Sequence, residues 1–278
     1  MSTGLMPTNI TITSPANLST ITTFLIDLDG VVYTGNTAIR GATEFFRFLE
    51  TTGRRSVCIT NNSTLTANQY VSKLGAMGIG VRELQILTSP QATAIYLREE
   101  LGLGPGARVF PIGEEGLVRA MLDEGFELVD NRADVVVCGL DRRLTYERLM
   151  RACFAIRDGA KLIATNPDLA LPTERGFLPG NGATIAYLEA ATGVTATVIG
   201  KPMATMLNVA MEMAGARVEE TAMIGDNLLT DIPAGINAGV TSILVLTGLA
   251  RREDLARALV QPHLVFEDLP ALQTALSR

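Results

Sequence analysis

Short apolar runs alternate with segments of helical periodicity along almost the whole chain, and this alternation constrains the fold more than any other feature. Thr23–Leu28 is a short apolar run followed by turn residues, which predicts a buried strand. Gly41–Thr52 carries apolar residues at helical spacing, and the Gly53 that follows is typical of a helix end. Strands that are separated by helices in this way predict parallel β-α-β units.

The same interpretation extends along the rest of the chain. The further strands that we predict are Ser56–Thr60, Ile86–Thr88, Arg108–Ile112, Val135–Gly139, Lys161–Ala164, Thr197–Ile199, Ala222–Ile224, Thr241–Leu246 and Leu264–Phe266, and the further helices are Thr66–Met77, Ala92–Leu101, Gly116–Glu124, Thr145–Arg157, Thr184–Ala191, Met203–Gly215 and Leu229–Ala238. Because these strands are continuously apolar, we expect a sheet buried on both faces, in a doubly wound, Rossmann-like α/β fold.

Two stretches interrupt the alternation. Gly102–Gly106 is rich in Gly with one Pro, which predicts a break and a candidate hinge, and the strand–helix alternation restarts after it. Asn166–Gly182 also contains many Gly and Pro residues, and we predict irregular structure there.

The composition excludes several classes of protein. The chain has 278 residues, of which 47% are hydrophobic, so global disorder is excluded. Its 23 Lys and Arg residues against 29 Asp and Glu residues give a net charge of −6, which argues against a nucleic-acid or anionic-membrane surface. Three Cys without a CxxC spacing and the single His263 argue against a disulfide scaffold, a Cys-based zinc site and a His-rich metal centre. We therefore expect carboxylate side chains to carry out any catalysis.

The sequence also bears on location. No apolar segment approaches the ~18–20 residues of a membrane span. Residues 1–20 are polar, without a basic region followed by an apolar one, so we expect no signal peptide and a cytoplasmic protein. We expect this leader to cover an edge of the first domain or to fray.

The first predicted strand ends in two carboxylates, Asp27 and Asp29, before Gly30. Side chains at i and i+2 of an extended segment point the same way, so the pair is costly unless a cation or a proton lies between the two groups. A turn with a helix-capping Asp is the structural alternative, since Asp-Gly is common turn chemistry. In parallel α/β sheets, ligands bind at the carboxyl ends of the strands, which is where this pair lies.

Three further strand ends carry polar residues: Thr60–Ser63, Gly200–Pro202 and Gly225–Asp231. Each has a structural alternative, respectively a cluster capping the next helix, a surface Lys ahead of a Pro at a helix start, and helix capping with a solvated helix face. Together the four ends supply an acidic pair, hydroxyl and amide groups, a Lys and a second acidic pair. That set matches phosphoryl transfer to a carboxylate, with Mg²⁺ ligands close by.

In this order the four motifs resemble those of the haloacid dehalogenase (HAD) superfamily. Asp27-Leu28-Asp29-Gly30-Val31 is similar to its first motif, Thr60 to its second, Lys201 to its third and Gly225-Asp226-Asn227…Asp231 to its fourth. Further segments are similar to the NagD/4-nitrophenylphosphatase subfamily, class IIA; they are Ile59-Thr60-Asn61-Asn62-Ser63, Ala164-Thr165-Asn166-Pro167-Asp168, Pro179-Gly180-Asn181-Gly182 and Gly200-Lys201-Pro202.

The resemblance implies an α/β cap domain inserted between the second and third motifs. We therefore expect the first part of the HAD core over 1–98, the cap over 99–192 and the second part of the core over 193–278. The expected activity is Mg²⁺-dependent hydrolysis of small phosphomonoesters through an aspartyl-phosphate. The expected partners are the small-molecule substrate and a second copy of the chain, in a homodimer formed through the cap. We expect no nucleic-acid or membrane partner.

The resemblance also assigns roles to residues. Asp27 is the nucleophile, and Asp29 protonates the leaving group and then activates the attacking water. The metal is held by Asp27, the backbone carbonyl of Asp29 and Asp226. The residues expected to bind the phosphoryl oxygens are Thr60, Asn61, Asn62 and Lys201, and those expected to orient the metal site and Lys201 are Asn227 and Asp231.

Substrate choice is expected to depend on the cap loop that contains Asn166, Asp168 and Leu171. Pyridoxal-phosphate phosphatases of this family carry a His where this chain has Leu171, which argues against that substrate. Nucleotides, sugar phosphates, phosphoglycolate and 4-nitrophenyl phosphate-like compounds remain open.

Three other classes of protein remain as alternatives. A dehalogenase needs neither the acid at Asp29 nor the Gly225–Asp231 motif. A phospho-acceptor signalling module normally lacks a cap and a general acid. A HAD-like protein that only binds would leave the intact motifs without use.

Overall fold

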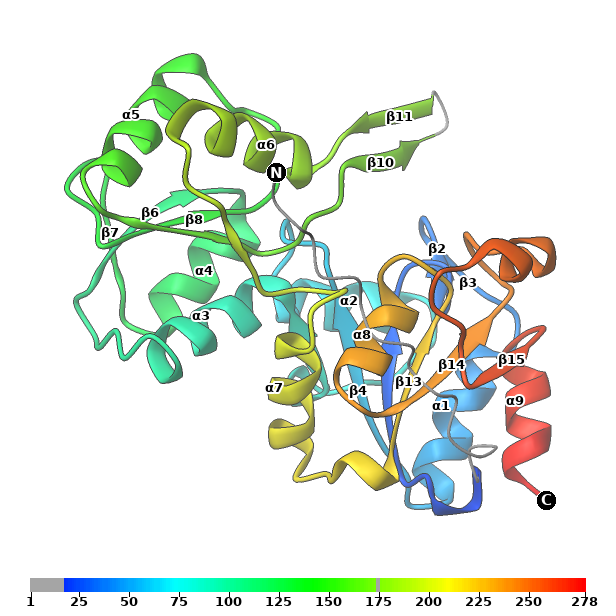
Figure 1. Cartoon of the computed structure of the whole chain (residues 1–278). Coiled ribbons are helices and arrows are strands. Elements are labelled where there is room, and N and C mark those ends of the chain that lie inside the picture. Colours follow the sequence, from blue (N-terminus) through cyan, green and yellow to red (C-terminus); the bar gives the residue numbers. More distant parts are fainter. Residues whose placement is uncertain (1–17, 174–175) are drawn as a thin grey trace.

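The computed structural model describes residues 18–173 and 176–278 and consists of two α/β parts (Figure 1). The predicted leader falls almost entirely on residues 1–17, outside the described residues. The strands of the larger part, from one edge of its sheet to the other, are β15 (Leu264–Phe266), β14 (Thr241–Val245), β13 (Thr221–Gly225), β1 (Thr23–Asp27), β4 (Arg55–Thr60) and β5 (Ile86–Thr88). All pairs in this sheet are parallel, which confirms the predicted doubly wound α/β fold.

The order of these strands fixes where a ligand binds. When the six strands are numbered by their order in the chain, the sheet has the order 3-2-1-4-5-6 of dinucleotide-binding folds. In this order the succession of strands reverses its direction across the sheet between the first and the fourth strand. Here those strands are β1 and β13, which pair in register through Ile26 and Ile224. Ligands bind outside the carboxyl ends of the two strands at such a switch point. Asp27 ends β1 and Asp226 follows β13, so both carboxylates lie at that position.

Both faces of the larger sheet are buried, as the apolar strands predict. Along β1, Phe24 and Ile26 pack into one apolar cluster and Leu25 packs into another on the opposite face. Helices α1 (Ala42–Thr51) and α9 (Leu269–Leu276) contribute to the first cluster, while α3 (Ser89–Glu99) and α7 (Thr205–Ala214) contribute to the second. Burial on both faces makes the sheet a rigid base for the groups at its edge.

The smaller part is a second parallel sheet, drawn in green in Figure 1. Its strands, from edge to edge, are β12 (Thr197–Val198), β9 (Lys161–Ala164), β8 (Val135–Cys138), β6 (Arg108–Ile112) and β7 (Glu127–Leu128). Taken in chain order, this is the flavodoxin-like order 2-1-3-4-5. Helices α5 (Tyr146–Arg157) and α6 (Asn181–Thr192) cover one face, and α4 (Glu115–Asp123) packs with α3 on the other. β12 belongs to this sheet although it lies after residue 192, the predicted end of the cap, and the domain bounds stay a prediction.

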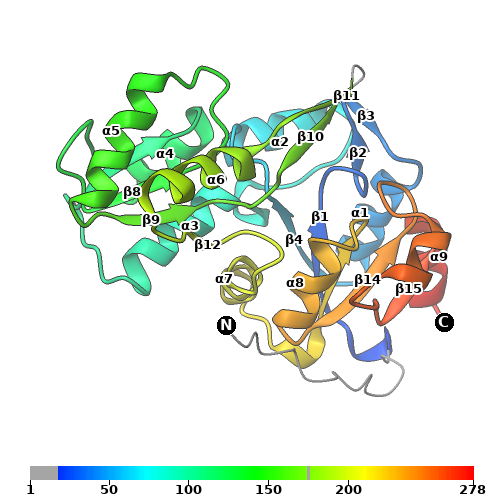
Figure 2. The same ribbon diagram turned by 45° about the horizontal axis from the view of Figure 1, so that its top comes forward.

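Two short antiparallel hairpins were not predicted. β2 (Tyr33–Thr34) and β3 (Thr37–Ala38) form a hairpin directly after the first motif. β10 (Ala170–Thr173) and β11 (Gly176–Pro179) pair within the stretch that we predicted to be irregular. The second hairpin extends from the cap on the side of the molecule that carries the first (Figures 1 and 2). β2 and β3 have two residues each and are too short to show an alternation, while β10 and β11 lie among Gly and Pro residues that favour turns.

The remaining helices are α2 (Ala67–Ala76) and α8 (Asp231–Asn237). α2 follows β4 and α8 follows β13, so each begins close to a strand end that carries polar residues. No helix in the described part of the chain is long and apolar enough to cross a membrane.

Candidate active site

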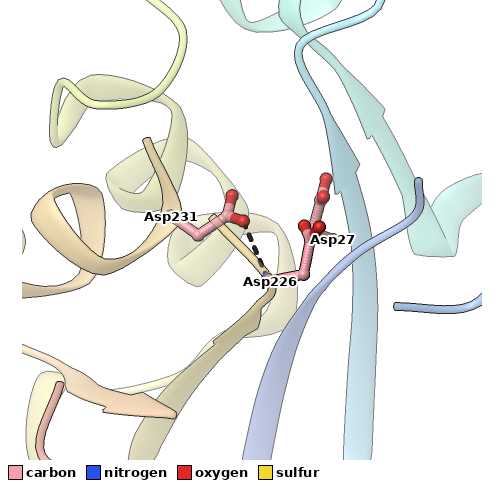
Figure 3. Close-up of side chains that lie close together, drawn as sticks. All are labelled: Asp27, Asp226 and Asp231. Atoms are coloured by element: carbon pink, nitrogen blue, oxygen red, sulfur yellow. Dashed lines mark hydrogen bonds between the residues drawn. The ribbon is translucent and has the colours of Figure 1, made fainter. Parts of the chain in front are cut away.

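Three buried carboxylates meet at the switch point of the larger sheet. Asp27 ends β1, Asp226 follows β13 and Asp231 begins α8. One oxygen from each lies within 4.8 Å of the others, and all three residues are buried (Figure 3). The sequence predicted that Asp27 and Asp226 would lie together, and the structure shows it. Groups of like charge this close need a cation or a proton.

Lys201 supplies part of the positive charge. Its Nζ donates to Oδ1 of Asp27 at 2.6 Å and to Oδ1 of Asp231 at 2.7 Å, and the residue is 2% exposed. The alternative of a surface Lys at a helix start is therefore wrong for Lys201. Burial alone would lower the pKa of this ammonium, but the two carboxylates raise it above its ordinary value. Lys201 is therefore charged at any physiological pH.

The charges of this cluster do not balance. Three carboxylates against one ammonium leave two excess negative charges when all four groups are ionised. Burial raises the pKa of Asp27 well above its usual range, although Lys201 opposes this. Burial, with the repulsion of Asp231, raises the pKa of Asp226 to about 7. The donor set is oxygen only, and two excess charges suit a hard divalent cation such as Mg²⁺.

The position of Asp226 is set by close backbone packing. A Cβ on Gly30 would lie 2.3 Å from Oδ2 of Asp226, and a Cβ on Gly248 would lie 1.9 Å from the same atom. Oδ2 also accepts a hydrogen bond from the backbone N–H of Leu249 at 2.6 Å. Only glycine fits at both sites, so the two loops form a cradle around this carboxylate.

Asp231 and Asn227 shape the loop that carries Asp226. Oδ2 of Asp231 accepts hydrogen bonds from the backbone N–H groups of Asp226 and Asn227, at 3.1 and 3.0 Å. Oδ1 of Asn227 accepts from the backbone N–H of Leu229 at 2.8 Å. These contacts agree with the expected supporting role of both residues, which stays a prediction.

Asp29 lies beside the cluster and is open to solvent. Its Oδ2 accepts a hydrogen bond from the Tyr33 hydroxyl at 2.9 Å. The protein around Asp29 nevertheless shields its carboxyl from part of the solvent and so raises its pKa, while the Tyr33 hydrogen bond and the Lys73 charge act in the opposite direction. A carboxyl with a raised pKa suits a proton donor.

The loop after β4 is built around local turns. Thr60 is 2% exposed, and its Oγ1 accepts from the backbone N–H of Asn62 at 3.1 Å. Oδ1 of Asn62 in turn accepts from the backbone N–H of Thr64 at 2.9 Å. The cap of α2 is Thr66, whose Oγ1 accepts from the backbone N–H of Gln69. The alternative in which Thr60–Ser63 caps this helix is therefore wrong.

Asn61 joins the two parts of the molecule. Its carboxamide accepts from the backbone N–H of Lys201 at 2.9 Å and donates to the backbone carbonyl of the same residue at 2.9 Å. It also donates to the Asp168 carboxylate at 3.3 Å. The amide of Asn166 donates to the backbone carbonyl of Asn61 at 2.8 Å. The side-chain amide of Asn61 thus contacts both Lys201 and Asp168, and its contact with phosphate stays a prediction.

The three residues of the predicted substrate loop lie in different surroundings in the structure. Asn166 and Asp168 reach the loop of Asn61 at the core, whereas Leu171 lies on β10 and pairs with Leu178. Burial raises the pKa of Asp168, although the charge of Lys201 opposes this. The role of these three residues in substrate choice stays a prediction.

Sequence reasoning missed two residues close to the site, Tyr33 and Lys73. Tyr33 is fully buried, and the Lys73 ammonium lies 3.7 Å from the centroid of its ring. The sequence offers one signal for Tyr33, its place four residues after Asp29, but a Tyr within an apolar run is typical of a core. For Lys73, its place in a predicted helix indicates only a side chain on the solvated face.

The family comparisons agree with this geometry. The model for haloacid dehalogenase-like hydrolases matches residues 24–127, and a second model, HAD-hydrolase-like, matches residues 198–272. The chain is 43% identical over 246 residues to the 5'-nucleotidase YutF of Bacillus subtilis, covering 88% of this chain and 95% of that protein.

Solved structures show the same likeness. A 4-nitrophenylphosphatase from Thermotoga maritima has a TM-score of 0.88 and 39% identity, covering 93% of this chain and 98% of that one. A glycerol phosphate phosphatase from Mycobacterium tuberculosis, solved in complex with magnesium, has a TM-score of 0.84 and 35% identity, covering 92% of this chain and 77% of that one.

The chain therefore belongs to the haloacid dehalogenase-like hydrolases. Within them it is a phosphatase of the NagD-like class IIA group, as the motifs predicted.

Proposed function

We propose that the protein hydrolyses small phosphomonoesters with Mg²⁺, through a phosphorylated Asp27. The observation that carries this proposal is the buried cluster of Asp27, Asp226, Asp231 and Lys201 at the switch point of the sheet. It combines a nucleophile, a cation for the phosphate and two excess negative charges that a divalent cation balances.

The metal would be held by the carboxylates of Asp27 and Asp226 and by the backbone carbonyl of Asp29. Asp231 has both oxygens engaged, by Lys201 and by backbone N–H groups, and therefore supports the ligands instead of replacing them. When bound, Mg²⁺ offsets the repulsion between an attacking carboxylate and a phosphate dianion.

In the first step, an oxygen of Asp27 forms a bond to phosphorus while the bond from phosphorus to the leaving oxygen breaks. Asp29 gives its proton to that leaving oxygen, so an alcohol departs. Lys201 and the loop of Thr60, Asn61 and Asn62 bind the phosphoryl oxygens. Positioning and charge do most of the work in such a transfer.

In the second step, Asp29 acts as a base. It takes a proton from a water, whose oxygen attacks the phosphorus, and the bond to Asp27 breaks to release inorganic phosphate. The solvent exposure of Asp29 gives a water access to it.

The substrate class follows from the relatives. Their names refer to a nucleotide, 4-nitrophenyl phosphate and glycerol phosphate, which are all small phosphomonoesters. We propose a substrate from this class for the present protein, chosen by the cap residues Asn166, Asp168 and Leu171. The homodimer through the cap stays a prediction, which the mass in solution tests.

The test is phosphate release from 4-nitrophenyl phosphate and a panel of phosphomonoesters, with Mg²⁺ and with EDTA. We expect multiple turnovers that need Mg²⁺ and are absent in Asp27→Asn. Unchanged turnover in EDTA contradicts the metal dependence. Phosphorylation that stops at one phosphate per chain supports a phospho-acceptor module instead.

A further inference from the structure

The Tyr33 hydroxyl is the group that holds Asp29. Its Oη donates to Oδ2 of Asp29 at 2.9 Å, and this is the one hydrogen bond to the Asp29 side chain that we find within the described residues. Tyr33 is fully buried, whereas Asp29 is open to solvent. One oxygen of Asp29 is therefore fixed by Tyr33, while the residue as a whole is exposed to solvent.

The position of Tyr33 is fixed through its backbone and through its ring. Its backbone N–H donates to the carbonyl of Leu28 at 3.2 Å, and its carbonyl accepts from the N–H of Gly30 at 2.9 Å. The strand pair Tyr33↔Ala38 fixes the hairpin. From α2, the ammonium of Lys73 lies 3.7 Å from the ring centroid. The hydroxyl thus has a defined position relative to the first motif.

We propose that Tyr33, supported by Lys73, is a positioning residue for proton transfer by Asp29. By occupying Oδ2, it turns Oδ1 toward the leaving group. As Asp29 loses its proton, negative charge develops on the carboxylate, and a hydroxyl donor with a nearby ammonium stabilises that charge. The inference rests on the proposed function, because it names how the general acid of that reaction is held.

A purely structural role makes a different prediction. If Tyr33 only fills the core, removal of its hydroxyl would slow all substrates by the same factor. If it acts through Asp29, the loss depends on how much the leaving group needs a proton. 4-Nitrophenolate hardly needs one, and the alkoxide of glycerol phosphate needs one strongly.

The variant is Tyr33→Phe, which keeps the ring, the packing and the contact with Lys73. The measured quantity is kcat/KM, which covers binding and the first phosphoryl transfer. For glycerol phosphate we expect a loss of about tenfold, as for a hydrogen bond to a charged group. For 4-nitrophenyl phosphate we expect a loss below about threefold.

Two controls make the result specific. Tyr96→Phe removes the hydroxyl of a half-buried tyrosine on α3, and we expect both substrates to retain wild-type kinetics. In an Asp29→Asn background, where no proton can be given, adding Tyr33→Phe should cause no further substrate-dependent loss.

The outcomes distinguish a failure of the proposed function from a failure of the role of Tyr33. A wild-type protein that hydrolyses neither substrate contradicts the proposed function. An active wild type, with equal losses on both substrates in Tyr33→Phe or with no loss at all, overturns the role of Tyr33 and leaves the proposed function standing.

Discussion

The ammonium of Lys201 lies 2.6 Å from Oδ1 of Asp27, although the two residues are 174 positions apart in the chain. Lys201 follows the cap, and Asp27 ends the first strand of the core. The contact therefore depends on the chain returning from the smaller sheet to the edge of the larger sheet at which Asp27 lies. The second contact of Lys201, with Asp231, fixes the direction of its side chain.

Lys201→Ala should lower kcat and raise KM together. In the proposed mechanism this charge binds phosphate in the ground state and offsets charge in the transition state, so both parameters depend on it. Loss of the ammonium also leaves the buried carboxylates of Asp27 and Asp231 without their cation, which destabilises the fold by about 3–5 kcal/mol. Steady-state kinetics and urea denaturation measure the two effects. The control is Lys161→Ala, at an exposed lysine of β9, and kinetics of Lys201→Ala equal to wild type would refute the phosphate-binding role.

Gly248→Ala should weaken the binding of Mg²⁺. The added Cβ would lie 1.9 Å from Oδ2 of Asp226, so the carboxylate must move. Displacing a ligand in this way typically costs 10–100-fold in metal affinity, and we expect about a tenfold higher Mg²⁺ concentration at half-maximal activity. Gly104→Ala is the matched control, since no atom lies within 4 Å of its new Cβ. An equal Mg²⁺ requirement in both variants would exclude Asp226 as a ligand.

The stability of the metal-free protein should fall as the pH rises. The pKa of Asp226 is raised by burial and by Asp231 from 3.8 to about 7, so between these values the folded state binds more protons than the unfolded state. The stabilising contribution of protonated Asp226 is therefore complete below 3.8 and is lost as the pH rises through about 7. Thermal melting of EDTA-treated protein at several pH values measures this.

The same experiment on Asp226→Asn isolates the contribution of this residue. The amide does not titrate, so the decline in melting temperature over this pH range should be smaller than in the wild type. Saturating Mg²⁺ should also reduce the decline in the wild type, because the cation favours the ionised carboxylate. Identical pH profiles for the two metal-free proteins would contradict the raised pKa of Asp226.

The sequence predicted the part of the site that lies at strand ends. Asp27, Lys201 and Asp226 stand where apolar runs stop, and the parallel topology brings such ends to one edge of a sheet. The contacts of Asn61 with Lys201 and Asp168 could not be predicted, because they join three distant segments. They depend on tertiary packing and have no local pattern.

Tyr33 and the hairpin β10–β11 escaped prediction for different reasons. Tyr33 combines a buried ring with a polar contact, and a Tyr within an apolar run of the sequence indicates only burial. The hairpin lies among Gly and Pro residues, which favour turns, and Leu171 and Leu178 pair across it without a run long enough to show alternation.

The most direct measurement is of covalent phosphate on Asp27. Labelled 4-nitrophenyl phosphate is mixed with enzyme and Mg²⁺, the reaction is quenched in acid, and the labelled peptide is identified. Asp29→Asn should accumulate the phosphoenzyme, because 4-nitrophenolate leaves without a proton while hydrolysis still needs the base. Asp27→Asn should carry no label, because an amide is a poor nucleophile. Label in Asp27→Asn, with none in Asp29→Asn, would reverse the assignment of nucleophile and acid.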